Sequence, residues 1–483
     1  MTLRKKMIKK FCMYFFSFAL ALLLFVGLQT KTFISTYFPQ SSLSQILFFI
    51  TSDLSGVDKL FVQTYIITCI VKPLIFTSFL VFFPQLYQLI YLISKKLAIK
   101  KYCSYLFKNY IQILFLTLLF VIYTAIIYIF LTHPNTLFAP KGTFYEEHYV
   151  DSSRQNFNFP ARKRNLIIIT LESFEKTFSN KNFFDEDLIA PLQILEKEGI
   201  SFQNYTNGFE TYITQPYFIA LFGGVPTNIL HLNMLNMFGK NIPQIQNVYT
   251  LGKILKNNGY HTLFIGGTDT NFAGQKQFLQ QNGFNETYID KSTIKKEYPL
   301  LHEAGNWGYG DKDIFKIAED YLSDQKQPFF AIINTIDTHH NYNPKIKQEK
   351  TFSKQEYKAI YNTAFETTEF IKHLKNQPFY KNTTIVLLGD HLRQGTDFDM
   401  PPKRSIYNLF INAASIPNNL NRTFTQIDLF PTILEAIGVK WKTHKLSLGT
   451  SVFSDNKTLE EQFGSGFLRQ KLSERNDLYK SLW

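Results

Sequence analysis

Four apolar runs in this chain are each followed directly by side chains that bind metals or transfer protons: NLIIITLES, HTLFIGGTD, PFFAIINTIDTHH and TTIVLLGDH. Glu172 follows the first run, and Asp390 and His391 follow the last. Two carboxylates and one imidazole form a donor set suited to Mn²⁺, Mg²⁺ or Zn²⁺. A divalent ion held there would polarise a phosphoryl group and lower the pKa of a coordinated hydroxyl. These residue types therefore indicate metal-assisted phosphoryl chemistry.

A nucleophile for such chemistry is present in ETYITQPYFIALFGGVPT, residues 210–227. Thr214 stands two residues before Pro216, and proline is favoured in the first turn of a helix. The free N–H groups of that turn would face an anionic substrate. A threonine hydroxyl is a weak nucleophile that needs activation, which the metal would supply. Residue type alone leaves two alternatives open: a plain capping hydroxyl, and Thr211 as the nucleophile.

Other polar residues after the runs have two interpretations each. His340 is either a general acid for the leaving alcohol or a solvated loop histidine. Arg393 either pairs with a phosphate through both guanidinium nitrogens or lies at the surface. For Asp269 and Asp337 a structural role is favoured over one in orienting the residues of the site.

The elements that position these residues are predicted from the same pattern. Short continuous apolar runs alternate with helix-like stretches, among them DLIAPLQILEKEG and YGDKDIFKIAEDYL. This alternation predicts an α/β domain with a mostly parallel central sheet sandwiched by helices. Functional groups collect at the carboxyl ends of such strands, so the four runs predict one shared site. We expect this domain over residues 163–443 and a C-terminal extension over 444–483.

The N-terminal region has the composition of a membrane anchor. Apolar stretches of bilayer-spanning length cover about 11–28, 65–93 and 111–131, within an anchor of residues 1–133 followed by a linker over 134–162. Lys and Arg cluster before the first stretch and between the second and third. This places the N-terminus in the cytoplasm and the α/β domain outside. The first stretch is not followed by a signal-peptide cleavage site, so a retained anchor is expected.

Charge and cysteine content narrow the function further. The 51 Lys and Arg residues outnumber the 38 Asp and Glu residues, giving a net charge of +13 that suits an anionic lipid surface. No zinc-finger spacing or basic helix is present, so a nucleic-acid partner is not expected. The three cysteines, Cys12, Cys69 and Cys103, all precede the predicted α/β domain. That domain therefore contains neither a thiolate metal site nor a cysteine nucleophile.

The ordered motifs over roughly residues 163–440 resemble the sulfatase-like, alkaline-phosphatase-superfamily transferases of bacterial envelopes. These include the lipoteichoic acid synthases, phosphoglycerol transferase I and, more distantly, the lipid A phosphoethanolamine transferases. The resemblance implies that Glu172, Thr214, Asp390 and His391 bind one divalent ion, with Mn²⁺ or Mg²⁺ favoured and Zn²⁺ also suitable. The spacing of TQPYFIALFGGVP to the family's motif selects Thr214 over Thr211.

The same resemblance implies the substrate-binding residues. NWGYGDKDIF corresponds to the family's Trp-Gly-x-x-Asp stretch, which makes Trp307 a candidate, and TIDTHHNYNP makes His339 another. His340 and Arg393, which are candidates from residue type and position and not from the resemblance, complete the expected set. The chain departs from the lipoteichoic acid synthases in having Tyr309 where they have an arginine two residues after the tryptophan. The Cys-x-Pro-x-Arg stretch of true sulfatases is absent, which excludes sulfate-ester hydrolysis through formylglycine.

By this resemblance, we expect a multi-pass protein of the bacterial cytoplasmic membrane with its catalytic domain on the periplasmic or extracellular side. It would move phosphoglycerol from phosphatidylglycerol to an envelope glycan or glycolipid through a phospho-threonine intermediate. Two alternatives within the enzyme class are phosphoethanolamine transfer from phosphatidylethanolamine to lipid A or a surface glycan, and phosphodiester hydrolysis. From a different class, an inactive scaffold that binds glycan is the remaining alternative.

Overall fold

The chain divides into two compact units, one holding the N-terminal helices and the other the α/β region. The computed structural model describes residues 3–37, 59–81, 114–115, 117–123, 139–184, 186–209, 214–228, 245–305, 307–339, 350–393 and 400–483. The two units are considered separately below.

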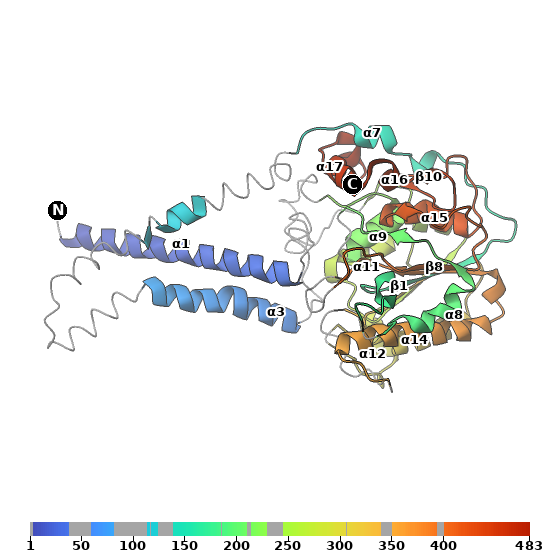
Figure 1. Ribbon diagram of the computed structural model, residues 1–483, viewed down its shortest axis with the longest axis horizontal. Coiled ribbons are helices and arrows are strands. Elements are labelled where there is room, and N and C mark those ends of the chain that lie inside the picture. Colours follow the sequence, from blue (N-terminus) through green and yellow to red (C-terminus); the bar gives the residue numbers. More distant parts are fainter. Residues whose placement is uncertain are drawn as a thin grey trace. The chain divides into compact units, whose positions relative to one another are not determined.

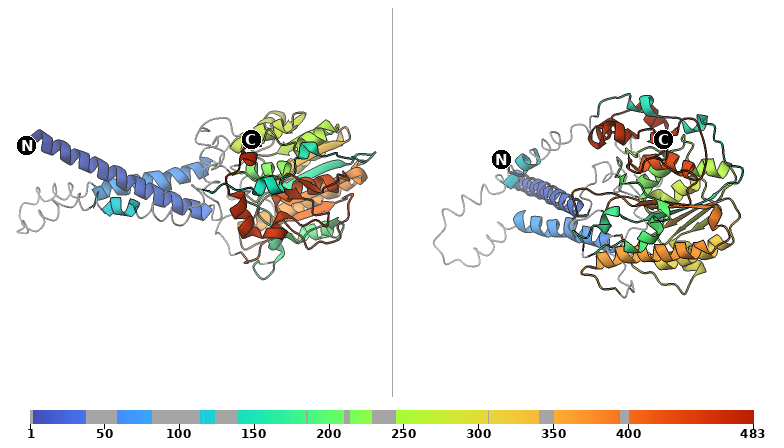
Figure 2. Two further views of the ribbon diagram at one scale, coloured as in Figure 1. Left: turned by 90° about the horizontal axis from the view of Figure 1, so that it is seen from above. Right: turned by 45° about the vertical axis from the view of Figure 1, so that its right-hand side comes forward.

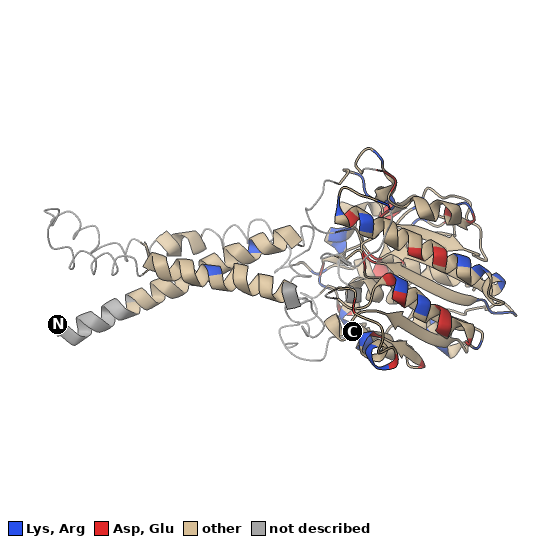
Figure 3. Ribbon diagram, turned by 90° about the horizontal axis from the view of Figure 1, so that it is seen from below, with Lys and Arg blue, Asp and Glu red and all other residues tan. Residues whose placement is uncertain are grey.

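The N-terminal unit contains two apolar helical stretches. The first is α1 (Leu3–Tyr37); the second begins with α3 (Lys59–Tyr65), passes through the π-helical turn η1 (Ile66–Val71) and continues to residue 81. Within them, Tyr14–Tyr37 and Phe61–Val81 are long and apolar enough to cross a membrane. Figure 3 shows that these two candidate spans carry far fewer charged residues than the α/β unit does.

The predicted multi-pass anchor of three spans is not supported. Only two candidate spans are found among the described residues, and they overlap the predicted spans 11–28 and 65–93. The third predicted span, 111–131, is described only at residues 114–115 and 117–123, and residues 82–93 lie outside the described part of the chain. What holds is the coarser statement that apolar helices precede the α/β region.

The α/β unit is built on a seven-stranded sheet in the order β2-β8-β7-β1-β6-β4-β5 (Figure 1). Its strands are β1 (Asn165–Leu171), β2 (Gly199–Ile200), β4 (His261–Gly266), β5 (Thr287–Ile289), β6 (Phe329–Asn334), β7 (Thr383–Gly389) and β8 (Asn408–Ile411). From β7 through to β5 all neighbouring pairs are parallel, and only β8 and β2 run antiparallel to their neighbours. The predicted, mostly parallel central sheet is therefore confirmed.

Helices cover both faces of this sheet, which is why its strands are continuously apolar. One face, which we call the α9 face, packs against α9 (Thr214–Gly223), α10 (Leu251–Asn257), α11 (Gln275–Gln281) and α15 (Leu429–Ala436). The other face packs against α8 (Gln193–Glu196), α12 (Lys291–Glu297), α13 (Asp311–Ser323) and α14 (Gln355–Lys375). Figures 1 and 2 show the two helical layers on opposite sides of the strands.

Alternate residues of each strand enter the two cores. In β1, Leu166 and Ile168 belong to the core of the α9 face, whereas Ile167 and Ile169 belong to the core of the opposite face. All four side chains are fully buried. This alternation fixes which polar residues at the strand ends share a face, because successive side chains of a strand point to opposite sides.

The segment before β1 and the end of the chain pack together. The helices of these two segments are α7 (Phe144–His148), α16 (Leu459–Phe463), α17 (Ser465–Leu472) and α18 (Asp477–Ser481). Outside the central sheet, β3 (Asn204–Tyr205) pairs with β9 (Thr423–Phe424), and β10 (Lys445–Leu446) pairs with β11 (Gly449–Thr450). The buried Tyr479 hydroxyl donates to the carbonyl of Pro226 (2.9 Å) and accepts from the N–H of Asn228 (2.6 Å). The C-terminal segment thus holds the loop that leaves α9. The predicted boundaries of linker, domain and extension stay a prediction.

Candidate active site

The polar residues at the strand ends lie on the α9 face. Each stands two or four residues after a buried strand residue that packs against α9 and its neighbours, and side chains separated by two along a strand point to the same face. Thr170 and Glu172 follow Ile168 in this way, Asn334 follows Ile332, and Asp390 follows Leu388. Because β7, β1 and β6 are adjacent and parallel, these side chains come together at one edge of the sheet.

Glu172, Asp390 and His391 form a compact buried cluster. One candidate ligand atom from each lies within 4.8 Å of the others. His391 Nε2 is 3.5 Å from Asp390 Oδ2 and 3.9 Å from Glu172 Oε1. The sequence prediction placed these three residues in one metal site, and the structure brings them together.

Hydrogen bonds orient each member of the cluster. His391 Nδ1 lies 3.0 Å from the carbonyl oxygen of Leu392, so Nδ1 carries the proton and Nε2 faces the carboxylates. Asp390 Oδ1 accepts from the backbone N–H groups of Ser173 (2.7 Å) and His391 (2.8 Å), which leaves Oδ2 toward the cluster. Glu172 Oε1 accepts from the hydroxyl of Ser173 at 2.7 Å. His391 Nε2 and the carboxylate oxygens therefore converge on one space.

The electrostatics of this cluster fit a cation. Burial, and after it the charge of Glu172, raise the pKa of Asp390 to about 7. Burial also favours a high pKa for Glu172, but His339 and His391 outweigh it, so this carboxyl has a lowered pKa. Burial disfavours charge on His391, yet Asp390 and Glu172 outweigh it and the imidazole pKa is raised. Two buried carboxylates that compete for positive charge, beside an imidazole nitrogen, are donors that fit a divalent ion.

The loop that carries Asp390 and His391 is held by a buried ion pair. Glu175 Oε1 accepts from the backbone N–H of Arg393 (2.9 Å), and its carboxylate also pairs with the guanidinium of Arg404. Arg404 donates to the carbonyl of Arg393 at 2.7 Å, and Asn207 Oδ1 accepts from Leu392 N–H at 2.8 Å. Arg393 is itself buried, and it is absent from the residues that line the pocket described below. Its contact with a phosphate stays a prediction.

Helix α9 begins at Thr214, with Pro216 in its first turn as the sequence predicts. The side chain of Thr214 and the whole of Thr211 lie outside the described part of the structure. Tyr217 and Phe218, the next residues of the helix, line the same pocket as Glu172 and Asp390. The beginning of α9 therefore reaches the candidate metal cluster.

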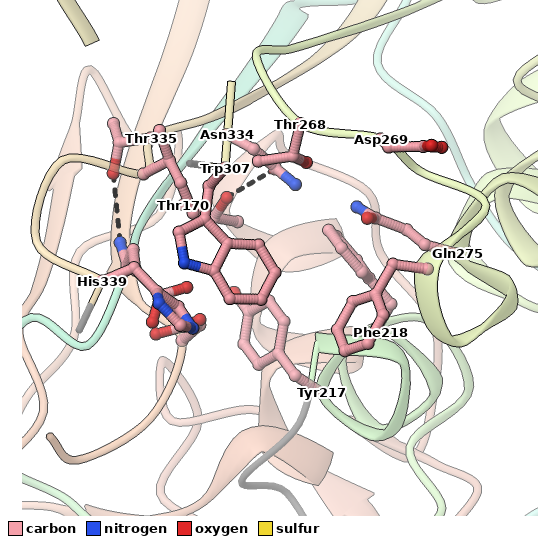
Figure 4. A pocket seen from close by; sticks show the side chains of 14 residues that line it. Thr170, Tyr217, Phe218, Thr268, Asp269, Gln275, Trp307, Asn334, Thr335 and His339 are labelled. Carbon is pink, nitrogen blue, oxygen red and sulfur yellow. Dashed lines mark hydrogen bonds between the residues drawn. The ribbon is translucent and has the colours of Figure 1, made fainter. Parts of the chain in front are cut away.

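This pocket encloses about 590 Å³ of empty space, counting the open solvent at its mouth (Figure 4). Trp307 and His339 form part of its wall, with ring centroids 4.4 Å apart and planes tilted by 55°. The residues that line it are Thr170, Glu172, Tyr217, Phe218, Thr268, Asp269, Phe272, Gln275, Trp307, Asn334, Thr335, Ile336, His339 and Asp390. His340 lies outside the described residues.

The loop that carries His339 is positioned from α13. The buried carboxylate of Asp311 accepts from the N–H groups of Ile336 (2.7 Å) and Asp337 (3.1 Å), and from the hydroxyl of Thr363 (2.6 Å). Asp337 accepts in return from the N–H of Asp311 at 3.2 Å. These contacts agree with the structural role favoured for Asp337.

Sequence reasoning missed several residues of the pocket. Three of them could have been predicted, because each lies at the carboxyl end of a buried strand, on the same face as strand residues that pack against α9. They are Thr170, Asn334 and Thr268. Tyr217 and Gln275 carry no such signal, because both lie in helices among residues that pack in the core.

Fold and site together define a protein of the alkaline-phosphatase-like α/β class. The structure is similar to an alkaline phosphatase superfamily protein from Vibrio parahaemolyticus, with a TM-score of 0.50 and 21% identity over 68% of this chain and 82% of that one. It is also similar to the lipoteichoic acid synthase LtaP from Listeria monocytogenes, with a TM-score of 0.50 and 19% identity over 64% of this chain and 80% of that one.

The chain belongs to the sulfatase family, whose model matches residues 164–439. Among curated proteins it is similar to phosphoglycerol transferase I of Escherichia coli, with 29% identity over 260 residues. That alignment covers 51% of this chain and 32% of the relative, so the chain spans about a third of the length of the curated relatives it matches.

Proposed function

We propose that this protein is a membrane-anchored phosphotransferase that moves the phosphoglycerol headgroup of phosphatidylglycerol to a hydroxyl of an envelope glycan or glycolipid. The observation that carries the proposal is the convergence of Glu172, Asp390 and His391 at the pocket into which the first turns of α9 lead. The apolar N-terminal helices support a lipid donor, because a membrane anchor raises the effective concentration of the donor at the site. Similarity to a phosphoglycerol transferase supports glycerol as the headgroup.

Glu172, Asp390, His391 and the hydroxyl of Thr214 would hold one divalent ion, with Mn²⁺ or Mg²⁺ favoured. Bound there, such an ion supplies charge stabilisation for the phosphoryl oxygens and acidity for the threonine hydroxyl. His391 contributes its Nε2 lone pair because its other nitrogen is committed to the Leu392 carbonyl. The backbone contacts to Asp390 Oδ1 hold that carboxylate in a fixed orientation.

Transfer proceeds in two displacements at the same phosphorus. In the first, Thr214 Oγ1 bonds to phosphorus, the bond to the diacylglycerol oxygen breaks, and the threonine proton ends on the released diacylglycerol. In the second, an acceptor hydroxyl bonds to phosphorus, the phospho-threonine bond breaks, and the acceptor's proton returns to Thr214. The backbone N–H groups at the start of α9 stabilise the phosphoryl charge in both steps. Trp307 and His339 form the wall against which the headgroup lies.

The direct test is to incubate the full chain with headgroup-labelled phosphatidylglycerol or phosphatidylethanolamine in the presence of Mn²⁺ and measure intact mass. We expect a glycerophosphate adduct on wild-type protein and none on Thr214→Ala. Thr211→Ala is the matched control, since it removes a hydroxyl three residues away, and it is expected to form the adduct normally.

Other outcomes would contradict the proposal in defined ways. A phosphoethanolamine adduct would identify an ethanolamine headgroup transferase. Free glycerophosphate released without an acceptor would identify a phosphodiesterase. An adduct that survives in Thr214→Ala but is lost in Thr211→Ala would reassign the nucleophile, and the absence of any adduct or turnover would favour a glycan-binding scaffold.

A further inference from the structure

Three polar groups around the pocket have no hydrogen-bond partner among the described residues. They are the hydroxyl of Tyr217, the side-chain Nε2 of Gln275 and the indole Nε1 of Trp307. Tyr217 is 1% exposed and Gln275 is 4% exposed, so solvent does not compensate for the missing partners. A buried donor without a partner carries a desolvation cost, and native proteins ordinarily satisfy such groups. Their gathering around one pocket indicates that a ligand supplies the acceptors.

The Tyr217 hydroxyl belongs to the wall that helix α9 contributes to this pocket. Tyr217 belongs to the first turns of α9, and the negative charge of Asp390 acts on it directly. Burial raises the pKa of this phenol well above its ordinary value, and Asp390 raises it further, so the phenol keeps its proton. A protonated phenol beside a phosphoryl site is a donor to a phosphoryl oxygen.

Gln275 lies at another part of the same pocket, at the start of α11. Figure 4 shows Gln275 beside Asp269, on the opposite side of the pocket from His339. Asp269 Oδ1 accepts from both the backbone N–H and the side-chain amide of Asn271 at 3.0 Å, and the carboxylate remains an acceptor to which either a hydroxyl or an ammonium can donate. The unpartnered Gln275 Nε2 is a donor, which an ammonium group cannot satisfy because it has no acceptor. A hydroxyl oxygen can.

Building on the proposed function, we propose that Tyr217 and Gln275 bind the transferred headgroup. The Tyr217 hydroxyl donates to a non-bridging phosphoryl oxygen, and the Gln275 amide donates to a headgroup hydroxyl. The pocket therefore selects a polyol phosphate such as glycerol phosphate over phosphoethanolamine. The indole Nε1 of Trp307, in the aromatic wall of the pocket, supplies a third hydrogen-bond donor to the ligand.

The affinities of the two soluble headgroups test this inference independently of whether the protein catalyses transfer. Full-length protein in detergent with Mn²⁺ is titrated calorimetrically with glycerol phosphate and with phosphoethanolamine, which share the phosphate and differ at the other end. We expect wild-type protein to prefer glycerol phosphate by about 10-fold or more, because a site with a buried donor rejects an analogue that leaves it unpaired. Tyr217→Phe should weaken both ligands by about 10-fold, since a hydrogen bond to a charged oxygen is lost in each case.

The Gln275 variants test selectivity rather than folding. Gln275→Leu should weaken glycerol phosphate by about 10-fold and leave phosphoethanolamine unchanged, while Gln275→Glu should reverse the preference by pairing a carboxylate with the ammonium. Tyr205→Phe is the matched control. Its hydroxyl is also buried without a partner among the described residues and interacts electrostatically with Tyr217 and Asp390, but Tyr205 does not line the pocket. Its binding should equal that of the wild type.

Three results would overturn the inference: equal or absent binding of the two headgroups by wild-type protein, wild-type binding in Tyr217→Phe, or an unchanged preference in both Gln275 variants. If Tyr217→Phe fails to fold, the reversal of preference in Gln275→Glu decides. The expected binding pattern without any lipid-derived adduct on Thr214 would remove the proposed transfer reaction and leave this inference standing.

Discussion

The two sides of the pocket differ in whether their polar groups have hydrogen-bond partners within the described structure. On the metal side, Glu172, Asp390 and His391 are held by Ser173 and the Leu392 carbonyl, and only the atoms that face the cluster are left for an ion. On the helical side, which α9 and α11 form, the described structure gives Tyr217 and Gln275 no partner for their donors. The first side is built to keep its geometry when empty, whereas the second is complete only with a ligand.

This difference makes the two sides respond to mutation in opposite directions. Removing a group whose partners are all in place leaves those partners unsatisfied and lowers stability. Removing an unpartnered group relieves its desolvation cost and raises stability, while binding is lost. The following predictions test that contrast, from the largest expected effect to the smallest.

The largest effect is expected from removing a carboxylate of the metal side. Glu172→Gln should weaken Mn²⁺ binding by at least about 100-fold, because it removes both a ligand and charge from the cluster. Calorimetric titration with Mn²⁺ measures this. Glu369→Gln on the exposed surface of α14 is the control and should bind as the wild type does. Unaltered affinity in Glu172→Gln would place the ion elsewhere.

The ion pair beneath the metal loop should matter most for stability. Arg404→Met leaves the fully buried Glu175 carboxylate without its cation, which should cost about 3 kcal/mol in the free energy of unfolding. Denaturant unfolding of the α/β unit, followed by circular dichroism, measures the loss. The double variant Glu175→Gln with Arg404→Met should recover much of it, since no buried charge remains. Equal losses in the single and double variants would show that the pair contributes packing alone.

The carboxylates also predict how stability depends on pH without metal. The pKa of Asp390 is raised to about 7 in the fold from an ordinary 3.8, so between those values the folded state binds more protons than the unfolded state. The raised pKa of His391 acts in the same direction. Between about pH 5 and 7 the unfolding free energy of the metal-free protein should therefore fall by on the order of 2 kcal/mol. Its thermal midpoint should fall over the same interval.

Saturating Mn²⁺ should reduce this slope, because the ion binds the deprotonated groups of the cluster. The slope that remains comes from carboxyls outside the cluster, such as Asp428, whose pKa burial also raises to about 7. The lowered pKa of Glu172 opposes the trend only up to about its ordinary value of 4.5, so it does not affect the interval between about pH 5 and 7. A metal-free midpoint that rises over the same pH window would contradict the raised pKa of Asp390.

The smallest effect should have the opposite sign. Without ligand, Tyr217→Phe should raise the free energy of unfolding by about 1 kcal/mol, since it removes a buried hydroxyl that lacks a partner. Chemical denaturation of the same α/β unit measures the gain, with Tyr145→Phe as the contrast. The Tyr145 hydroxyl donates to the Leu472 carbonyl at 3.2 Å, so its loss should destabilise. Destabilisation of both variants alike would remove the distinction between the two sides of the pocket.

The sheet and the metal-side residues could be predicted because they follow from periodicity. A strand covered on both faces must be continuously apolar, and its first polar residues must fall at the carboxyl end. Glu172 and Asp390 are such residues, and the adjacency of β1 and β7 brings them together. The same reasoning extends to Thr170 and Asn334, which the prediction left unused.

Tyr217 and Gln275 could not be found in this way. Tyr217 stands in an apolar helix whose other residues are core, so its sequence context is that of a packed aromatic. Gln275 opens a helix after a left-handed turn at Gly274, whose φ is 72°, and nothing local shows where its amide points. Their role depends on which groups lack partners, a property of the tertiary structure alone.

The order of the strands also has a consequence for synthesis of the chain. β1 is the first strand of the sheet to be synthesised, yet its neighbours are β6 and β7. Leu166 therefore cannot pair until the ribosome has synthesised Phe330 and Thr384. Until then the nascent chain carries an apolar strand with both edges unpaired, which is an aggregation hazard. A holding chaperone should therefore bind arrested chains that end before β6 more strongly than chains that extend past β7.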